Sequence, residues 1–129
     1  MGRGKTIPPA FRERLMLAVI AVYGCRFCSW AHTGAALRSG MAEDEISGIL
    51  IGSVDNCPPE EAIAVLYAQH WADSDGRPDH EAVERLEQMY DAETARVIDT
   101  ILHIIRIGNY IGIGYERLLN RISFNSRGR

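Results

Sequence analysis

Cysteine is scarce in this sequence, which has 3 cysteines among its 129 residues. That number is too small, and odd, for the disulfide framework of a small secreted scaffold. Positive charge is not in excess either, since 14 Lys and Arg accompany 17 Asp and Glu and the net charge is −3. Nucleic-acid-binding domains usually show a clear basic excess. We therefore predict no nucleic-acid partner and a cytoplasmic protein.

Long hydrophobic runs are also missing. The longest run, Leu15 to Tyr23, is far shorter than the roughly 20 residues that a membrane-spanning helix needs. The apolar stretch from Ile101 to Ile113 is interrupted by His103, Arg106 and Asn109. Prolines and charged residues ahead of Leu15 do not fit a secretory signal peptide. The sequence therefore predicts no membrane partner.

What is present is the composition of a globular protein, with 47% hydrophobic and 24% charged residues. Phe11, Leu15, Ala18 and Val22 recur at spacings of three and four, which places them on one helix face. Prolines, acidic first turns and apolar stripes predict further helices at about 25–38, from 42, at 58–72, from 78, from 91 and at 110–122. No segment alternates as a strand would. We predict an all-α compact bundle of about six or seven helices, forming a single domain over residues 1–129, with flexible ends at 1–7 and 125–129.

The C-terminal third combines an apolar helix face with three glycines. The face is broad enough to suggest burial on more than one side, in part against neighbouring copies; it consists of Val97, Ile98, Ile101, Leu102 and Ile105. Gly108, Gly112 and Gly114 do not follow a strand, so they do not predict a phosphate-binding loop. Close helix packing explains them better.

A Cys-x-x-Cys motif at Cys25 and Cys28 is followed by His32 four residues later. Residues three and four apart share a helix face, so these three side chains form one stripe. Gly24 places Cys25 near a helix N-terminus, where the helix dipole stabilises a thiolate. The spacing lets the two sulfurs close a disulfide, and His32 can exchange a proton with Cys28, its nearest partner by spacing. The pattern is that of a redox-active dithiol.

Two other interpretations of the cysteine pair stay open. The pair could be two buried core cysteines, which are common. It could also be half of a zinc site, which needs four ligands. The other candidate ligands are His32, Cys57 and histidines 70, 80 and 103, and no second pair exists. We expect no metal and no cofactor, and we interpret Cys57 as structural or incidental.

The remaining histidines are expected to have structural roles. Tyr67, His70 and Trp71 share a helix face, which predicts packing around a hydrogen-bonded histidine. His80 falls in a first turn and is expected to be exposed. His103 lies in the most apolar helix and is predicted to be a core histidine.

Glu13 is a further candidate, twelve residues before Cys25 and between two arginines. If the chain turns at Gly24, the first two helices could pack so that this carboxylate reaches His32. Spacing alone cannot show this contact, and by itself favours a solvated charge on the first helix.

The segment from Glu13 through His32, with the pattern E-x11-C-x-x-C-x3-H, resembles the signature of alkylhydroperoxidase D-like proteins of the carboxymuconolactone decarboxylase superfamily. Gly24, the small residues around His32 and the acidic helix start at Glu43 continue the likeness. The resemblance implies an all-helical subunit of a homotrimer or homohexamer. It also implies a thiol-dependent peroxidase or disulfide oxidoreductase that takes a small hydroperoxide and a dithiol reductant, such as a lipoyl-bearing protein.

The same resemblance implies a role for each motif residue. Cys28 would be the nucleophile, Cys25 the resolving thiol, His32 the base and Glu13 the second member of the proton relay. The chain departs from the pattern at Phe27, where a second histidine can stand in the family, so the relay is shorter here. Helix-dipole reasoning instead favours Cys25 as the thiol of lower pKa.

Two other functions stay open. One is a lyase acting on a ring-opened aromatic lactone, as in the decarboxylase branch, which has no evident need for a dithiol. The other is a non-enzymatic helical assembly whose dithiol senses oxidation.

Overall fold

The computed structural model describes residues 7–127, and side chains as far as residue 123. This part of the chain is all-helical, as predicted. Its six helices are α1 (Pro9–Tyr23), α2 (Arg26–Arg38), α3 (Glu43–Leu50), α4 (Pro59–Asp73), α5 (His80–Met89) and α6 (Ala92–Arg127). The flexible ends predicted at 1–7 and 125–129 lie largely outside the described residues, although 125–127 belong to α6. The single-domain boundary stays a prediction.

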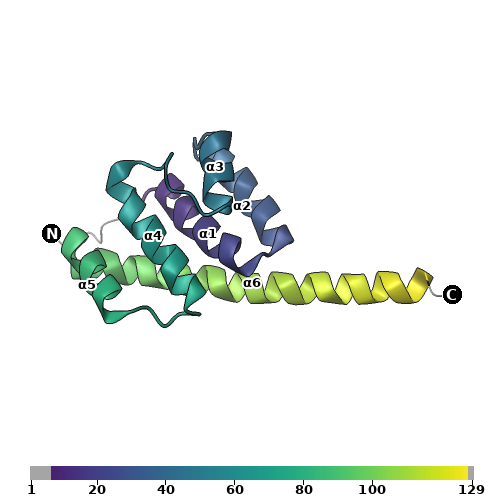
Figure 1. Ribbon diagram of the computed structural model, residues 1–129. Helices are drawn as coiled ribbons and strands as arrows, with labels where there is room; N and C mark the ends of the chain where they lie inside the picture. The colour runs from purple at the N-terminus through teal and green to yellow at the C-terminus, as the bar shows by residue number, and fades with distance from the viewer. Residues whose placement is uncertain (1–6, 128–129) are drawn as a thin grey trace.

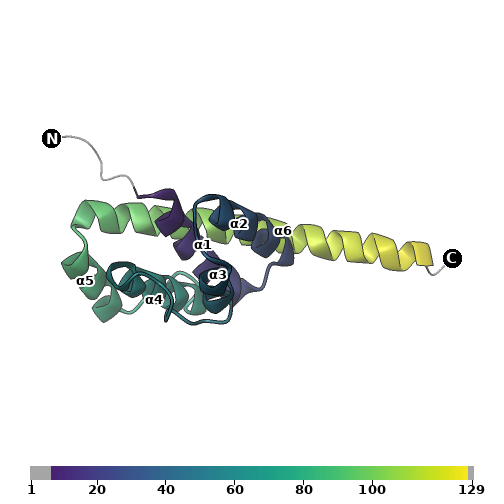
Figure 2. The ribbon, with the colours of Figure 1, turned by 90° about the horizontal axis from the view of Figure 1, so that it is seen from above.

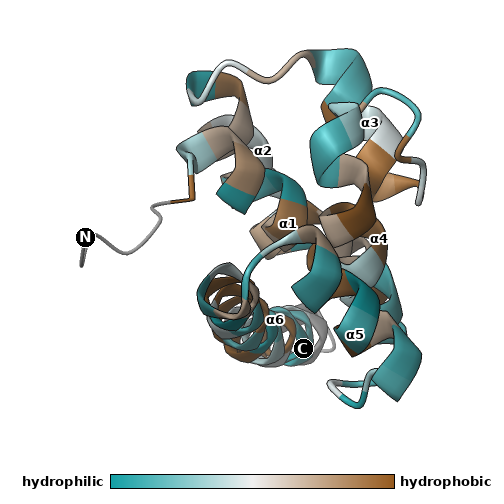
Figure 3. Ribbon diagram, turned by 90° about the vertical axis from the view of Figure 1, so that its left-hand side faces the viewer, coloured by the Kyte–Doolittle hydropathy of each residue, from teal (hydrophilic) through white to brown (hydrophobic). Residues whose placement is uncertain are grey.

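Helix α1 forms the centre of the bundle. It contacts α2, α3, α4 and α6, and Figure 3 shows it lying between α2, α4 and α6. Every residue from Leu15 to Ile20 is buried. A helix that is covered on all sides needs apolar residues around its whole circumference. This explains the unbroken hydrophobic run of the sequence without a membrane.

The helix starts follow the local chemistry of the sequence. Pro9 and Pro59 occupy the first positions of α1 and α4, where a missing N–H has no cost. The first turn of α3 carries three acidic residues, which favour the positive end of the helix dipole. Before α6, the Asp91 carboxylate accepts a hydrogen bond of 2.7 Å from the Thr94 amide.

The two C-terminal helices predicted from the sequence are one helix of 36 residues, α6. A glycine inside a helix costs about 1 kcal/mol relative to alanine, which weakens a helix without ending it. Helix α6 packs against α1, α2, α4 and α5. Its C-terminal end extends well past the rest of the molecule, as Figures 1 and 2 show.

The apolar face of α6 is covered by this chain itself. Ile98, Ile101, Leu102 and Ile105 are buried and Val97 is partly buried, so this chain itself covers most of the face that was predicted to meet neighbouring copies. The apolar side chains of α6 that stay exposed include Ile104, Ile107, Tyr110, Ile111, Tyr115, Leu118, Leu119 and Ile122. Within the described residues, Ala92–Ser123 is the one segment that is long and apolar enough to cross a membrane, by length and composition only. In its apolar stretch of 18 residues, 33% of the residues are buried.

Candidate redox site

The turn between α1 and α2 places Cys25 at the start of α2. Gly24 ends α1 in the left-handed conformation, with φ at 75°, and its amide donates to the Ile20 carbonyl at 2.8 Å. A residue with a Cβ is strained in this conformation, which explains the glycine. Cys25 is the N-cap of α2, and its sulfur accepts a hydrogen bond of 3.2 Å from the Cys28 amide. The predicted position at a helix N-terminus is confirmed.

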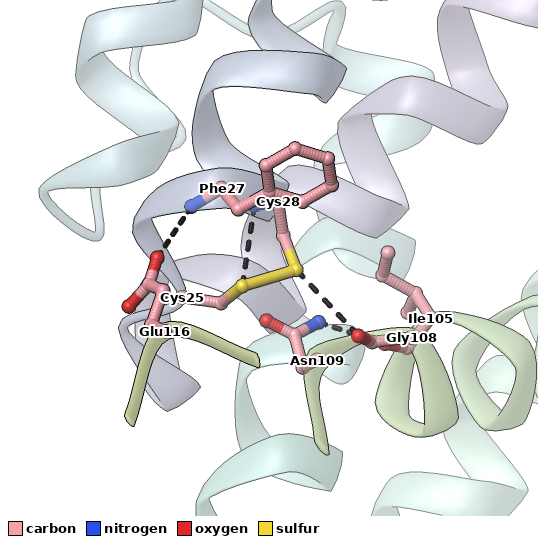
Figure 4. Close-up of a disulfide and its surroundings, with 7 residues drawn as sticks. All are labelled: Cys25, Phe27, Cys28, Ile105, Gly108, Asn109 and Glu116. Carbon is pink, nitrogen blue, oxygen red and sulfur yellow. Dashed lines mark hydrogen bonds between the residues drawn. A yellow bond between two sulfur atoms is a disulfide. The ribbon is translucent and has the colours of Figure 1, made fainter. Parts of the chain in front are cut away.

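Cys25 and Cys28 form a disulfide, with their Cα atoms 5.3 Å apart. Both residues are buried, with 1% and 6% of their surface exposed. The cover is α6, which crosses the disulfide as Figure 4 shows. The Gly108 carbonyl oxygen lies 3.7 Å from the Cys28 sulfur. A Cβ on Gly112 would lie 2.6 Å from the Cys25 sulfur and 2.9 Å from that of Cys28, so only glycine fits there.

Glu13 is buried and paired with His32. The residue is 4% exposed, and its Oε2 lies 2.7 Å from His32 Nδ1. The solvated position that spacing alone favoured is therefore wrong, because α1 and α2 pack with these two side chains facing each other. A buried carboxylate needs a partner of this kind to offset its loss of hydration.

The Glu13 contact sets the proton on the imidazole ring. Because a carboxylate oxygen accepts, His32 Nδ1 is the donor of this contact, and in the neutral imidazole the lone pair is then on Nε2. The His32 side chain is 26% exposed. Cys28 and His32 are both on α2 and one turn apart, so they share a face as predicted. No hydrogen bond joins His32 to either sulfur among the described residues.

A neighbouring ion-pair network ties α1 to α3 and α4. Arg14 makes contacts of 2.7 and 3.1 Å with Glu45 and of 2.9 Å with Glu61. The hydrogen bond to Glu45 is the main cause that raises the pKa of Arg14 above its ordinary value. Arg14 therefore binds the carboxylates of α3 and α4. Glu13 instead pairs with His32.

A second carboxylate meets α2 from α6. Glu116 Oε1 accepts a hydrogen bond of 2.7 Å from the Phe27 amide, in the first turn of α2 (Figure 4). This amide is one of the N-terminal donors that have no partner inside the helix. The Phe27 side chain is 52% exposed and carries no group that transfers protons. Glu116 thus places negative charge at the helix end where the disulfide lies.

Surface access reaches Cys25 from one side. A hollow of about 400 Å³ includes Cys25 in its lining, together with Ile20, Ala21, Gly24, Arg26, Ser29, Trp30 and Leu50. Trp30 is 74% exposed at its rim. A larger hollow of about 610 Å³ lies between α4 and α5, with His70 and Tyr67 in its lining. None of the four predicted site residues lines the larger hollow, whereas Cys25 lines the smaller one.

Cys57 stands apart from the pair. It is buried and free of a disulfide, and burial raises the pKa of its thiol to about 11. Among the described residues no group of three or more His, Cys, Asp or Glu side chains could hold a metal ion.

The other histidines fit the predictions in two of three cases. His70 Nε2 accepts a hydrogen bond of 3.0 Å from the Asp79 amide, so the hydrogen-bonded histidine is confirmed. His80 is exposed, also as predicted. His103 is not in the core, because its side chain is 52% exposed. It packs edge-on against Trp71 and lies 3.4 Å from Asp99.

The sequence profile of the carboxymuconolactone decarboxylase family matches residues 1–70. This range exceeds half of the chain and contains all four predicted site residues. The chain belongs to this family. No curated protein and no solved structure matches it. The resemblance stated from the Glu13 to His32 pattern is thereby confirmed at the level of the family.

The cover from α6 lies beyond the part of the chain that the family profile matches. Gly108, Asn109, Gly112 and Glu116 were not predicted as site residues. Close helix packing was predicted for Gly108, Gly112 and Gly114. Only at Gly112 would an added Cβ collide with a neighbour, since a Cβ on Gly108 or Gly114 would meet nothing within 4 Å. A polar Asn109 in an apolar run was the one available signal in the sequence.

Proposed function

We propose that this member of the family is a thiol-dependent peroxidase or disulfide oxidoreductase that works through Cys25 and Cys28. The observation that carries the proposal is the disulfide at the N-terminus of α2. A partly buried Glu13–His32 pair joins α1 to α2 and supplies an oriented base. A dithiol beside an oriented imidazole is the machinery that cysteine redox chemistry requires.

The peroxidase cycle has three steps. The Cys28 thiolate attacks a hydroperoxide oxygen, the O–O bond breaks, and the products are a Cys28 sulfenic acid and an alcohol that takes up a proton. The Cys25 thiol then attacks the sulfenic sulfur, which forms the disulfide and releases water. A dithiol reductant returns two electrons and two protons and leaves as its own disulfide.

His32 and Glu13 manage the protons of this cycle. His32 Nε2 takes the proton of the Cys28 thiol and returns a proton to the leaving oxygen. Glu13 holds the ring through Nδ1 and stabilises the imidazolium that forms. With Phe27 between the cysteines, His32 is the nearest imidazole in the motif, so the rate depends on this single residue.

The hollow beside Cys25 gives the reductant its point of attack. A small dithiol that enters past Trp30 meets the sulfur of Cys25 first, because this residue lines the hollow. Attack there releases Cys28 as the leaving thiolate, ready for the next peroxide. Turnover requires a reducing compartment, which agrees with the cytoplasmic location predicted from the sequence.

Hydroperoxide consumption with dihydrolipoamide as reductant tests the proposal. We expect turnover by the wild type, loss of turnover in Cys28→Ser and in Cys25→Ser, and full turnover in the matched control Cys57→Ser. Full activity of Cys28→Ser would overturn the mechanism.

Glu13 and His32 favour one second candidate, because an oriented acid–base pair also suits lyase chemistry on a ring-opened lactone. This candidate predicts activity toward a carboxylated lactone that survives replacement of both cysteines. A redox sensor, by contrast, predicts a reversible disulfide with no turnover. The same assay, run with both substrates, separates the three.

We also propose that the subunit assembles as a homotrimer or homohexamer. The support is the exposed apolar surface along α6, which includes Ile111 at 67% and Leu118 at 54% exposure. Isolated apolar side chains are normal on a surface, but a continuous apolar stripe marks an interface. Sedimentation analysis of the wild type and of Ile111→Glu is the test, and a monomeric wild type would refute the proposal.

A further inference from the structure

Asn109 is a buried polar residue that the proposed cycle does not use. It is completely buried in α6. Its Nδ2 donates a hydrogen bond of 2.7 Å to the Ile105 carbonyl, which fixes the orientation of the amide. Its Oδ1 then has no hydrogen-bond partner among the described residues. Such a buried unpartnered oxygen is costly and uncommon in folded proteins.

The position of Asn109 connects this oxygen with the disulfide. Its helical neighbours Gly108 and Gly112 both approach the sulfurs. Figure 4 shows the Asn109 amide below the disulfide, with the nitrogen toward Ile105 and the oxygen on the side of Cys25. The unpartnered oxygen thus faces the redox centre.

Whether this oxygen has a partner depends on the redox state. In the disulfide neither sulfur carries a proton, so neither can donate. Reduction by a dithiol breaks the S–S bond, adds two electrons and two protons, and creates two S–H donors. The Cys28 thiol then has the Gly108 carbonyl oxygen as its acceptor. Asn109 Oδ1, buried without a partner on the side of Cys25, is the acceptor that we assign to the Cys25 thiol.

We infer that Asn109 is the residue that sets the redox equilibrium of the pair, because its carbonyl oxygen accepts a hydrogen bond from the Cys25 thiol only in the reduced protein. This inference rests on the proposed redox function. The oxygen is unpartnered in the disulfide and partnered in the dithiol, so it favours reduction. It also favours a protonated Cys25, as Glu116 does at the same helix end. Both groups oppose the helix dipole and leave Cys28 as the nucleophile.

Equilibration of the full-length protein with mixtures of reduced and oxidised dithiothreitol measures this effect. We expect Asn109→Leu to shift the dithiol–disulfide equilibrium about fivefold toward the disulfide, which corresponds to a potential lower by about 20 mV. Asn109→Ser keeps a donor for the Ile105 carbonyl but lacks the amide oxygen, and we expect a shift in the same direction.

The matched control is Gln69→Leu. Gln69 Nε2 is the other buried side-chain atom without a partner in the described chain. It lies on α4, which makes no contact with α2 within the described residues. We expect this variant to keep the wild-type equilibrium.

Thermal unfolding of both redox forms separates a redox role from a structural one. If the inference holds, Asn109→Leu loses stability in the reduced form and keeps or gains it in the oxidised form. Equal losses in both forms, with the equilibrium within twofold of the wild type, would overturn it. The proposed function fails by a different outcome, namely a wild-type pair that does not interconvert with dithiothreitol at all.

Discussion

Replacement of Gly112 by alanine is expected to destabilise the oxidised protein. The new Cβ would lie 2.6 Å from the Cys25 sulfur and 2.9 Å from the Cys28 sulfur, whereas ordinary contacts begin near 3.4 Å. The sulfurs are bonded to each other and cannot rotate away, so α6 has to move outward. Overpacking of this kind costs about 1–3 kcal/mol. Alanine recovers about 1 kcal/mol of helix propensity, which leaves a net loss of about 0–2 kcal/mol.

Gly114→Ala is the matched control, two residues along the same helix. A Cβ there meets nothing within 4 Å, so the full helix gain of about 1 kcal/mol is expected. Urea denaturation of the oxidised proteins should therefore place Gly112→Ala about 1–3 kcal/mol below Gly114→Ala. Reduction should narrow this gap, because separate thiols can rotate. Equal stability of the two variants in the oxidised state would refute the packing of α6 on the disulfide.

Three further predictions concern charge and burial at Glu116, Asp75 and Cys57. Glu116→Gln removes a negative charge from the N-terminus of α2, so iodoacetamide should alkylate the reduced pair severalfold faster at pH 7, while Glu93→Gln at the far end of α6 should not change the rate. Hydrogen bonds, first of all from Tyr23, hold the pKa of Asp75 below its ordinary value of 3.8. The stability that they contribute is complete above that value and is lost as the pH falls through the lowered pKa. The free energy of unfolding of Asp75→Asn should therefore fall less steeply with acid than that of the wild type, and identical curves would contradict this. Burial raises the pKa of Cys57 to about 11, so this thiol should resist alkylation at pH 7 in the native protein and react after unfolding, and rapid native labelling would show that it is accessible.

The helices α1 to α5 were predictable because their boundaries are local. Proline at a first helical position, acidic first turns and the Gly24 turn act through the backbone of the residues beside them. The position of Cys25 at a helix start followed from the same local rules. The site motif was predictable for this reason as well, since three of its residues lie within eight positions of one another.

The other features of the fold and the site depend on tertiary packing, which cannot be read from the spacing of residues in the sequence. Glu13 could be assigned to His32 only by the family resemblance, because the contact requires α1 and α2 to pack side by side. Helix α6 continues through its glycines because a helix tolerates single glycines. The need for glycine at position 112 comes from the sulfurs of Cys25 and Cys28, which are at least 84 residues earlier in the chain. His103 is half-exposed beside Trp71, at the edge of the covered face of α6, and composition alone does not say which residues that face includes.

Mapping of the cysteines after one equivalent of hydroperoxide tests the central claim most directly. The fully reduced protein is treated with cumene hydroperoxide, its remaining thiols are alkylated, and its peptides are identified by mass spectrometry. The proposed cycle predicts a Cys25–Cys28 disulfide, an alkylated Cys57 after unfolding, and one equivalent of alcohol released. Three alkylated cysteines and unconsumed peroxide would contradict it, and would return the pair to a structural role in the core.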